Sequence, residues 1–181
     1  MSNTTDLESL AAPLKAAIRD VPDFPKPGIV FKDITTLLKE PALFRRTIDL
    51  LVVLCGDRPC DKVVAIESRG FILGGVLAER LGAGFVPVRK KGKLPAGTRR
   101  HTYDLEYGTD CVEIHEDALR AGERTLVVDD VIATGGTARA AGELVRKLGA
   151  RLAGYLFLIE LGFLNGREQL EGYDLFTLLK Y

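Results

Sequence analysis

The sequence lacks the features that mark nucleic-acid-binding and membrane proteins. Its 181 residues hold 25 basic and 25 acidic side chains, and a net charge of zero predicts no general attraction to nucleic acid or to an anionic membrane. No apolar run is long enough to span a bilayer, and residues 1–6 are too polar for a signal peptide. We therefore expect a cytoplasmic protein with neither nucleic acid nor membrane among its partners.

Cysteine and histidine are too sparse for a zinc site. Cys55, Cys60 and Cys111 lack C-x-x-C spacing, and the chain holds two histidines. An odd number of scattered cysteines is typical of free thiols in a reducing compartment, and we expect these thiols to be buried. With 46% hydrophobic residues and neither a linker nor a repeat, residues 1–181 are expected to form a single domain.

The most informative segment is 125–138, which reads Thr-Leu-Val-Val-Asp-Asp-Val-Ile-Ala-Thr-Gly-Gly-Thr-Ala. Its apolar run has no alternation and predicts a strand buried on both faces of a parallel sheet. Asp129 and Asp130 are expected beyond the carboxyl end of that strand, where such sheets bind ligands. The loop that follows offers backbone N–H groups, hydroxyls and a helix start, which suit a phosphate: Thr134, Gly135, Gly136 and Thr137.

The acids beside this loop narrow the choice of ligand. Carboxylates repel a bare phosphate, but they accept hydrogen bonds from neutral hydroxyls. A ribose 5-phosphate carries both groups and therefore fits the segment. The spacing matches neither a P-loop nor a dinucleotide-binding loop. The alternative interpretation is that Asp129 and Asp130 cap a turn and the two glycines supply its bend.

A second strand-end motif has the same layout. The apolar residues 63–66 run into Glu67, Ser68, Arg69 and Gly70 before another expected helix. A hydroxyl, backbone N–H groups and an arginine fork suit a diphosphate. Taken alone, Ser68 can equally be a helix N-cap, and Glu67 and Arg69 a surface ion pair. Together the two motifs predict a ligand with phosphates at both ends.

Residues 89–108 combine positive charge with the hinge candidates Gly92 and Gly97. We expect 89–102 to be a loop and 89–108 to form a mobile lid that closes over an anionic substrate and excludes water. A basic run is otherwise a solvated face or a nucleic-acid patch. Glu106 lies where the lid returns and is either an acid or base of the closed site or a solvent-facing strand residue.

Strands alternating with helices predict the fold class α/β, a doubly wound and mainly parallel sheet flanked by helices. The proline-rich segment 21–28 is expected to be an irregular, stiff connection. We expect helices at 7–18, 41–54, 70–81 and 137–148, strands at 29–34, 63–66, 84–88, 126–128 and 152–159, an edge strand at 176–179, and a hairpin pairing 103–106 with 111–115.

Four segments together resemble the type I phosphoribosyltransferase family. Residues 125–138 match its signature for phosphoribosyl diphosphate (PRPP), and 22–34, 91–95 and 105–108 are similar to its adenine-using members. The resemblance covers about residues 14–181. It implies a type I phosphoribosyltransferase-like fold with a small N-terminal hood (1–35) and the lid (89–108). It also implies transfer of the phosphoribosyl group from PRPP to adenine, giving AMP and diphosphate with inversion at the ribose C1.

The resemblance further implies a homodimer and a magnesium cofactor bound mainly through diphosphate and water. Asp129 and Asp130 would hold the ribose hydroxyls, and the 5-phosphate would lie on Ala133, Thr134, Gly135, Gly136 and Thr137. The diphosphate would contact Glu67, Ser68, Arg69, Arg89, Lys90 and Lys93, with Arg89 reaching across the dimer interface. Adenine would lie between Phe31 and Leu161, with its edge read by the backbone of Val30 and Lys32. The family also implies a cis peptide between Glu67 and Ser68.

Three other functions compete with this one. The first is transfer to a 6-oxopurine such as xanthine, and the second is a PRPP-sensing regulator that acts on nucleic acid. The regulator would need an added DNA-binding domain or a basic face, and the sequence contains neither. A purely structural homodimer is the third, and it leaves both anion-binding loops without a role.

Overall fold

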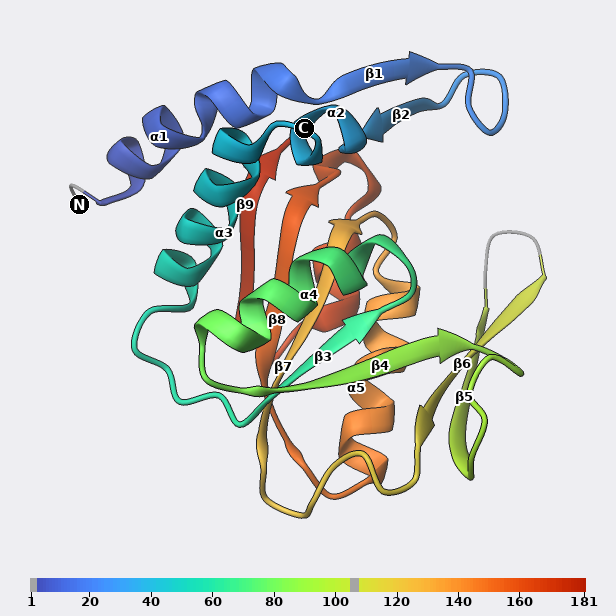
Figure 1. The fold of residues 1–181 in the computed structure, drawn as a ribbon. Helices are drawn as coiled ribbons and strands as arrows, with labels where there is room; N and C mark the ends of the chain where they lie inside the picture. The colour runs from blue at the N-terminus through green and yellow to red at the C-terminus, as the bar shows by residue number, and fades with distance from the viewer. Residues whose placement is uncertain (1–2, 105–107) are drawn as a thin grey trace.

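A seven-stranded sheet runs through the centre of the molecule, with helices on both faces and a separate two-stranded sheet at one end (Figure 1). The structure, a computed structural model, describes residues 3–104 and 108–181, and the side chains from residue 7 onward except that of residue 104. The strands are β1 (Arg19–Pro22), β2 (Val30–Asp33), β3 (Lys62–Ile66), β4 (Gly84–Lys90), β5 (Thr98–Asp104), β6 (Thr109–His115), β7 (Arg124–Ile132), β8 (Arg151–Glu160) and β9 (Leu175–Lys180). The helices are α1 (Asn3–Ala17), α2 (Thr35–Leu38), α3 (Pro41–Cys55), α4 (Arg69–Arg80), α5 (Gly136–Lys147), and the short 3₁₀ turns η1 (Gly162–Leu164) and η2 (Gly166–Leu170).

The order of strands in the large sheet is β5-β6-β4-β3-β7-β8-β9. The five strands from β4 to β9 in this order are mutually parallel, and the β5–β6 hairpin adds to β4 in the antiparallel sense. The expected mainly parallel α/β sheet is therefore confirmed, and so is the edge position of the last strand. The doubly wound arrangement follows because α4 and α5 connect parallel strands on opposite faces.

Both faces of the central strands are buried, as the unbroken apolar runs predict. Val63 of β3 packs into the core beneath α3 and α4, whereas its neighbour Val64 packs into the core beneath α5. Figure 1 shows α3 and α4 on one side of the sheet and α5 on the other. This double cover rigidly fixes the carboxyl ends of β3 and β7, where both sequence motifs lie.

The expected loop at 89–102 is wrong in extent. Strand β4 continues to Lys90, and β5 already begins at Thr98, so the connection comprises residues 91–97. The reason is non-local pairing: Thr98 opposes His115, and the ladder continues to Asp104 opposite Thr109. The hairpin itself is confirmed, but charged residues are part of its strands because β6 satisfies their backbone groups.

The small sheet pairs β1 with β2, with Val21 opposite Phe31, and lies beyond the carboxyl ends of β7 and β8 (Figure 1). The Lys32 ammonium lies 4.3 Å from the centre of the Tyr181 ring, which joins this sheet to the C-terminal residue. The stiff connection expected at 21–28 is shorter than expected, because β1 extends through Pro22.

The three cysteines are free, as expected, but the expectation of burial holds for Cys55 alone. Cys60 and Cys111 are half-buried. Burial raises the pKa of the Cys55 thiol to about 11, so this thiol is unreactive at neutral pH. No helix in the described part of the chain combines the length and the apolar character needed to cross a membrane.

Candidate active site

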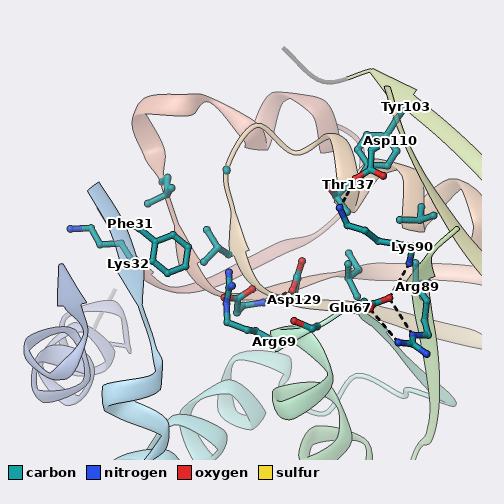
Figure 2. A pocket seen from close by; sticks show the side chains of 18 of the residues that line it. Phe31, Lys32, Glu67, Arg69, Arg89, Lys90, Tyr103, Asp110, Asp129 and Thr137 are labelled. Atoms are coloured by element: carbon teal, nitrogen blue, oxygen red, sulfur yellow. Dashed lines mark hydrogen bonds and ion pairs between the residues drawn. The ribbon is translucent and has the colours of Figure 1, made fainter. Parts of the chain in front are cut away.

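A cavity of about 540 Å³ opens where the small sheet, the β5–β6 hairpin and the carboxyl ends of β3, β4 and β7 meet. Figure 2 shows side chains from all of these elements converging on it. Its lining contains most of the residues that the sequence predicted, from both anion-binding motifs and from β2, which follows the proline-rich segment. The lining residues are Ile29, Val30, Phe31, Lys32, Ile66, Glu67, Ser68, Arg69, Val88, Arg89, Lys90, Tyr103, Asp110, Val112, Asp129, Asp130, Val131, Ala133, Thr137 and Leu161.

A smaller cavity of about 90 Å³ adjoins the first one at the loop between β7 and α5. The two share Asp129, Val131, Ala133 and Thr137, so they form one continuous site. The smaller cavity is lined by Asp129, Val131, Ile132, Ala133, Thr134, Gly135, Gly136, Thr137 and Ala138.

The structure does not support the predicted position of Lys93 and does not describe that of Glu106. Lys93 is exposed and is not among the described lining of either cavity, although its carbonyl oxygen accepts a hydrogen bond of 3.1 Å from Arg89 Nη1. Glu106 lies outside the described residues. Its predicted role therefore remains a prediction.

The two adjacent acids lie within β7 and not beyond it, which corrects the expectation. Pairing between β7 and β3 ends at Val128, but pairing between β7 and β8 continues to Ile132. Asp129 and Asp130 therefore stand on a strand that extends past its neighbour β3, and the space left at the end of β3 is the cavity. A strand presents its carboxyls more rigidly than a loop would.

The acids are close enough to affect each other. Asp130 is 4% exposed, and one of its carboxylate oxygens accepts a hydrogen bond from Arg69 Nε. Asp129 Oδ1 accepts the backbone N–H of Asp130 at 2.8 Å. Burial, and next the negative charge of Asp130, raise the pKa of Asp129 well above its usual range. The neutral form of Asp129 is therefore favoured more than in water.

The β7–α5 loop has the form of an anion cradle. Gly135 takes a left-handed conformation with φ of +85°, and α5 begins at the next residue. The first N–H groups of a twelve-residue helix therefore face the small cavity. The Thr137 hydroxyl donates to the Tyr103 hydroxyl at 3.0 Å, which connects the cradle to the hairpin.

The motif between β3 and α4 also faces the large cavity. The peptide between Glu67 and Ser68 is cis, as expected. Ser68 occupies the N-cap position of α4, but its side chain makes no capping hydrogen bond. The alternative of a surface pair between Glu67 and Arg69 is wrong, because Glu67 pairs with Arg89 and Arg69 pairs with Asp130.

Glu67 organises the basic end of β4. Its carboxylate accepts hydrogen bonds from Arg89 Nε and Nη2, both at 3.2 Å, and from the backbone N–H of Lys90 at 3.1 Å. Burial acts to raise the pKa of Glu67, but these donors outweigh it, and the pKa is lowered. The acid is therefore held as a carboxylate that keeps the Arg89 guanidinium beside the cavity.

Phe31 and Leu161 form the apolar end of the cavity, on β2 and directly after β8. Phe24 packs edge-on against Phe31 with ring centres 5.2 Å apart, and the Arg69 guanidinium lies 5.2 Å from the centre of the Phe31 ring. Lys32 Nζ pairs with Asp20 at 2.6 Å. The Lys32 ammonium is thus engaged elsewhere, which leaves its backbone as the part that can face a ligand.

Sequence reasoning missed Tyr103 and Asp110, which lie opposite each other in the hairpin. Asp110 Oδ2 lies 2.9 Å from Lys90 Nζ and accepts the Tyr103 hydroxyl at 3.3 Å. Burial acts to raise the pKa of Asp110, but Lys90, the backbone N–H of Cys111 and the Tyr103 hydroxyl together outweigh it, and the pKa is lowered. A signal was present, because Asp110 shares a strand face with the buried Val112, two residues further on.

Comparison with known proteins shows that this chain is similar to the phosphoribosyl transferases. The phosphoribosyl transferase domain matches residues 33–172. The adenine phosphoribosyltransferase of Nostoc punctiforme is 56% identical over 170 residues, covering 93% of this chain and 99% of that protein. The adenine phosphoribosyltransferase of Solibacter usitatus is 58% identical over 168 residues, covering 93% of this chain and 97% of that protein.

Solved structures of adenine phosphoribosyltransferases show the same similarity. The adenine phosphoribosyltransferase of Rhodothermus marinus superposes with a TM-score of 0.92 at 54% identity, covering 96% of this chain and 99% of that one. The Saccharomyces cerevisiae adenine phosphoribosyltransferase, solved with an imino-altritol bisphosphate and adenine, gives a TM-score of 0.88 at 47% identity, covering 94% and 98%. This chain therefore belongs to the phosphoribosyl transferase family and, within that family, to the adenine phosphoribosyltransferases.

Proposed function

We propose that this protein transfers the 5-phosphoribosyl group of PRPP to adenine, giving AMP and diphosphate in purine salvage. The observation that carries the proposal is one continuous site. It runs from the apolar end at Phe31 and Leu161, past the carboxyls of Asp129 and Asp130, to the anion cradle between β7 and α5. This order matches a planar base, a sugar and a phosphate in sequence. Membership in the adenine phosphoribosyltransferases supports the same reaction.

The base would lie between Phe31 and Leu161 at the apolar end of the cavity. The exposed backbone of β2 offers the N–H and C=O groups of Val30 and Lys32 to the edge of the ring. A backbone C=O can accept the 6-amino group of adenine, whereas the oxygen of a 6-oxopurine would leave it unpaired at a cost of about 1–3 kcal/mol. The protein should therefore prefer adenine to hypoxanthine, guanine and xanthine.

Asp129 and Asp130 would accept hydrogen bonds from the ribose hydroxyls, and the loop from Ala133 to Thr137 would hold the 5-phosphate. As the bond from C1 to diphosphate breaks, positive charge develops on the sugar. The acid pair stabilises this charge by orienting the hydroxyls from a rigid strand. Adenine N9 attacks the face opposite to the leaving diphosphate, which inverts C1.

The diphosphate would be held by Ser68 and by the basic groups around it, namely Arg69, Arg89, Lys90 and Lys93. In this structure three of the four cations pair with acids: Arg69 with Asp130, Arg89 with Glu67 and Lys90 with Asp110. Diphosphate would compete with those carboxylates for charge-assisted hydrogen bonds. The cations are thus kept at the site by partners that a more highly charged ligand displaces.

Magnesium fits this site as an ion held mostly by the substrate. In the described residues no cluster of three or more acids, histidines or cysteines forms a metal cage. Asp129 and Asp130 offer hard oxygen donors, and magnesium commonly combines one or two carboxylates with phosphates and water. When bound, the ion would neutralise the diphosphate and make it a better leaving group. Turnover should cease when a chelator removes magnesium and return when the metal is restored.

The lid and Glu106 would complete the proposed site. We place the lid at 89–108 and the hood at 1–35, supported by the positions of the β5–β6 hairpin and the small sheet beside the cavity. Glu106 would either transfer a proton on the purine ring or tighten its contact with the ligand as the lid closes. Glu106→Gln should lower kcat by more than it weakens PRPP affinity, measured by steady-state kinetics and calorimetry; equal losses would contradict a transition-state role.

We further propose that the protein is a homodimer. The support is an apolar patch on α4 and β4, formed by Ile72, Val76 and Phe85, which are 43%, 36% and 41% exposed. Phe71 packs edge-on against Phe85 at 5.8 Å and joins the helix to the strand. Arg89 stands near the end of the same strand β4 and pairs with Glu67 of its own chain, so its reach into the partner's site stays a prediction.

We propose that the protein is located in the cytoplasm. The support is that its three cysteines are free, because the cytoplasm is a reducing compartment in which thiols stay reduced. Fractionation of cells expressing the full chain should find it with cytoplasmic markers. Recovery with a membrane fraction would contradict the proposal.

The decisive experiment for the reaction is an initial-rate assay with PRPP and each of four bases. Adenine should be consumed with release of diphosphate, and hypoxanthine, guanine and xanthine should react much more slowly. A faster rate with a 6-oxopurine would favour that rival reaction. No turnover, together with tight salt-sensitive binding of a nucleic acid, would favour a regulator.

A further inference from the structure

Residues 161–170 lie against the loop Ala133–Thr137 between β7 and α5, which we call the phosphate loop. Apart from Leu161, no motif in this segment assigns it a function. The segment starts directly after β8 and contains η1 and η2. Its first residue, Leu161, donates its backbone N–H to the carbonyl oxygen of Ile132 at 3.0 Å. The base-binding end of the proposed site is therefore tied to the residue that precedes the phosphate loop.

Gly166 meets the phosphate loop backbone to backbone. A Cβ placed on Gly166 would lie 2.1 Å from the carbonyl oxygen of Ala133 and 3.0 Å from the backbone nitrogen of Gly135. Conversely, a Cβ on Gly135 would lie 2.3 Å from the carbonyl oxygen of Gly166. No side chain fits between the two segments, so the shape of the loop depends on a glycine outside it.

The neighbouring Arg167 is fixed by a bidentate ion pair. Its Nε and Nη2 donate to the two carboxylate oxygens of Glu160 at 3.1 and 2.7 Å. The Glu160 side chain is 7% exposed and also accepts the Thr177 hydroxyl at 2.9 Å. A forked pair to a buried carboxylate fixes both position and orientation, so it holds the adjoining Gly166 in place.

A second interaction, a side-chain hydrogen bond, connects η2 with α5, the helix that follows the phosphate loop. Arg139 Nη1 of α5 donates to Gln169 Oε1 at 3.1 Å. Glu160 and Arg167 line neither cavity of the proposed site; they line a different cavity of about 530 Å³ between α1 and β9. They therefore act from outside the site.

We propose that Gly166 and Arg167 are positioning residues that set the geometry of the 5-phosphate cradle at Ala133–Thr137. The inference rests on the proposed function, because it assigns the cradle to the 5-phosphate of PRPP. The Glu160–Arg167 pair holds the segment, and Gly166 transmits that position to the loop through direct backbone contact. The opposite, diphosphate end of the site is built on β3 and α4 and should keep its geometry.

Calorimetry with two separate probes tests this directional claim. Ribose 5-phosphate reports on the cradle, and inorganic diphosphate with magnesium reports on the β3–α4 end. We expect Gly166→Ala to weaken binding of ribose 5-phosphate about tenfold or more, because small displacements of positioned groups are costly. Binding of diphosphate should stay within about twofold of wild type.

The arginine provides a second, independent variant. Arg167→Met keeps most of the side-chain stem but removes the fork, and it should raise KM for PRPP about tenfold with a smaller change in kcat. Arg167→Lys should recover part of the loss. Arg146→Met is the matched control, because Arg146 pairs with Glu143 on the exposed side of α5 at 3.0 Å, and its kinetics should equal those of wild type.

The outcomes separate the two proposals. Unchanged binding of ribose 5-phosphate by both variants, or equal loss of both probes, overturns the positioning role. Thermal melting identifies a variant that fails to fold, and the other variant then decides. If the wild-type chain binds neither PRPP nor ribose 5-phosphate, the proposed function fails as well, whereas normal wild-type binding with unaffected variants overturns this inference alone.

Discussion

Asp129, a proposed ribose-binding residue, has an environment that disfavours its charged form in the folded chain. Its carboxyl lies beside that of Asp130, and a Cβ on Gly70 of α4 would come within 2.7 Å of Asp129 Oδ1. So little space leaves the carboxyl poorly solvated, and the nearby negative charge adds repulsion. Both effects raise the pKa of Asp129 and disfavour its ionised form. Residues selected for function are often of this kind.

Replacing this acid by its neutral isostere should stabilise the protein without ligand. Because the folded-state pKa of Asp129 is raised, its stability contribution is complete below the unfolded pKa of about 3.9 and is lost as pH rises through the folded pKa. The loss begins above the unfolded pKa, so at pH 7 Asp129→Asn should gain about 0.5–2 kcal/mol in free energy of unfolding. The gain should vanish at about pH 3. Urea denaturation at both pH values measures it.

Asp49→Asn is the control for this substitution. Asp49 is 47% exposed and pairs with Arg80 at the surface, so its removal should change stability by no more than about 0.5 kcal/mol at either pH. PRPP affinity should fall sharply in Asp129→Asn and stay unchanged in the control. A destabilised Asp129→Asn protein at pH 7 would refute the strained state of this carboxyl.

At the scale of elements, the sequence predicted the parts whose signals are local. The strands β3 and β7 and the helices α4 and α5 follow from apolar runs and from small residues at their junctions. The extents of β4, β5 and β7 did not follow, because each depends on a partner strand elsewhere in the chain. Strand β7 reaches Ile132 only because β8 pairs with it there.

The site shows the same difference between features set by local sequence and features set by contacts between distant segments. The predicted strand-end residues do converge on one cavity, because carboxyl ends of adjacent parallel strands meet at one edge. Gly166 could not be predicted, since its role is a backbone contact with a loop about thirty residues earlier in the chain. The pairing of Lys90 with Asp110 also required knowledge of the hairpin register.

The Tyr103 hydroxyl links the hairpin to the phosphate loop, and this link can be tested. Tyr103→Phe removes the hydrogen bonds with Thr137 and Asp110 while it keeps the ring. One net hydrogen bond contributes about 1 kcal/mol, so we expect kcat/KM for PRPP to fall by roughly fivefold. Steady-state kinetics measure the effect, and faster amide exchange in β5 should accompany it.

The hydroxyl of Tyr173 provides a comparison for this change. Tyr173 is 37% exposed and packs edge-on against Tyr155 at the other end of the sheet. Tyr173→Phe should therefore leave kcat/KM unaltered. If both substitutions had the same effect, the contact between Tyr103 and Thr137 would have no role in holding the hairpin near the cradle.

At the scale of the whole molecule, the exposed apolar side chains are unevenly distributed. Ile72 and Val76 are four residues apart and lie on one face of α4, and Phe85 of β4 continues that surface. A contiguous apolar patch of this kind is typical of a subunit interface, whereas an isolated exposed residue such as Val53 of α3 is not. In the proposed homodimer, a second copy of the chain would cover this patch.

Charged substitutions in the patch should separate the subunits. Ile72→Glu buries an unpaired carboxylate in the proposed interface, so light scattering after size-exclusion chromatography should report a monomer. Val53→Glu introduces the same charge at a side chain that is 64% exposed and should leave the dimer intact. Because Arg89 is expected to complete the partner's site, the Ile72→Glu monomer should also lose turnover at an unchanged melting temperature. A fully active monomer would show that each chain holds a complete site, with the Arg89–Glu67 pair serving only its own cavity.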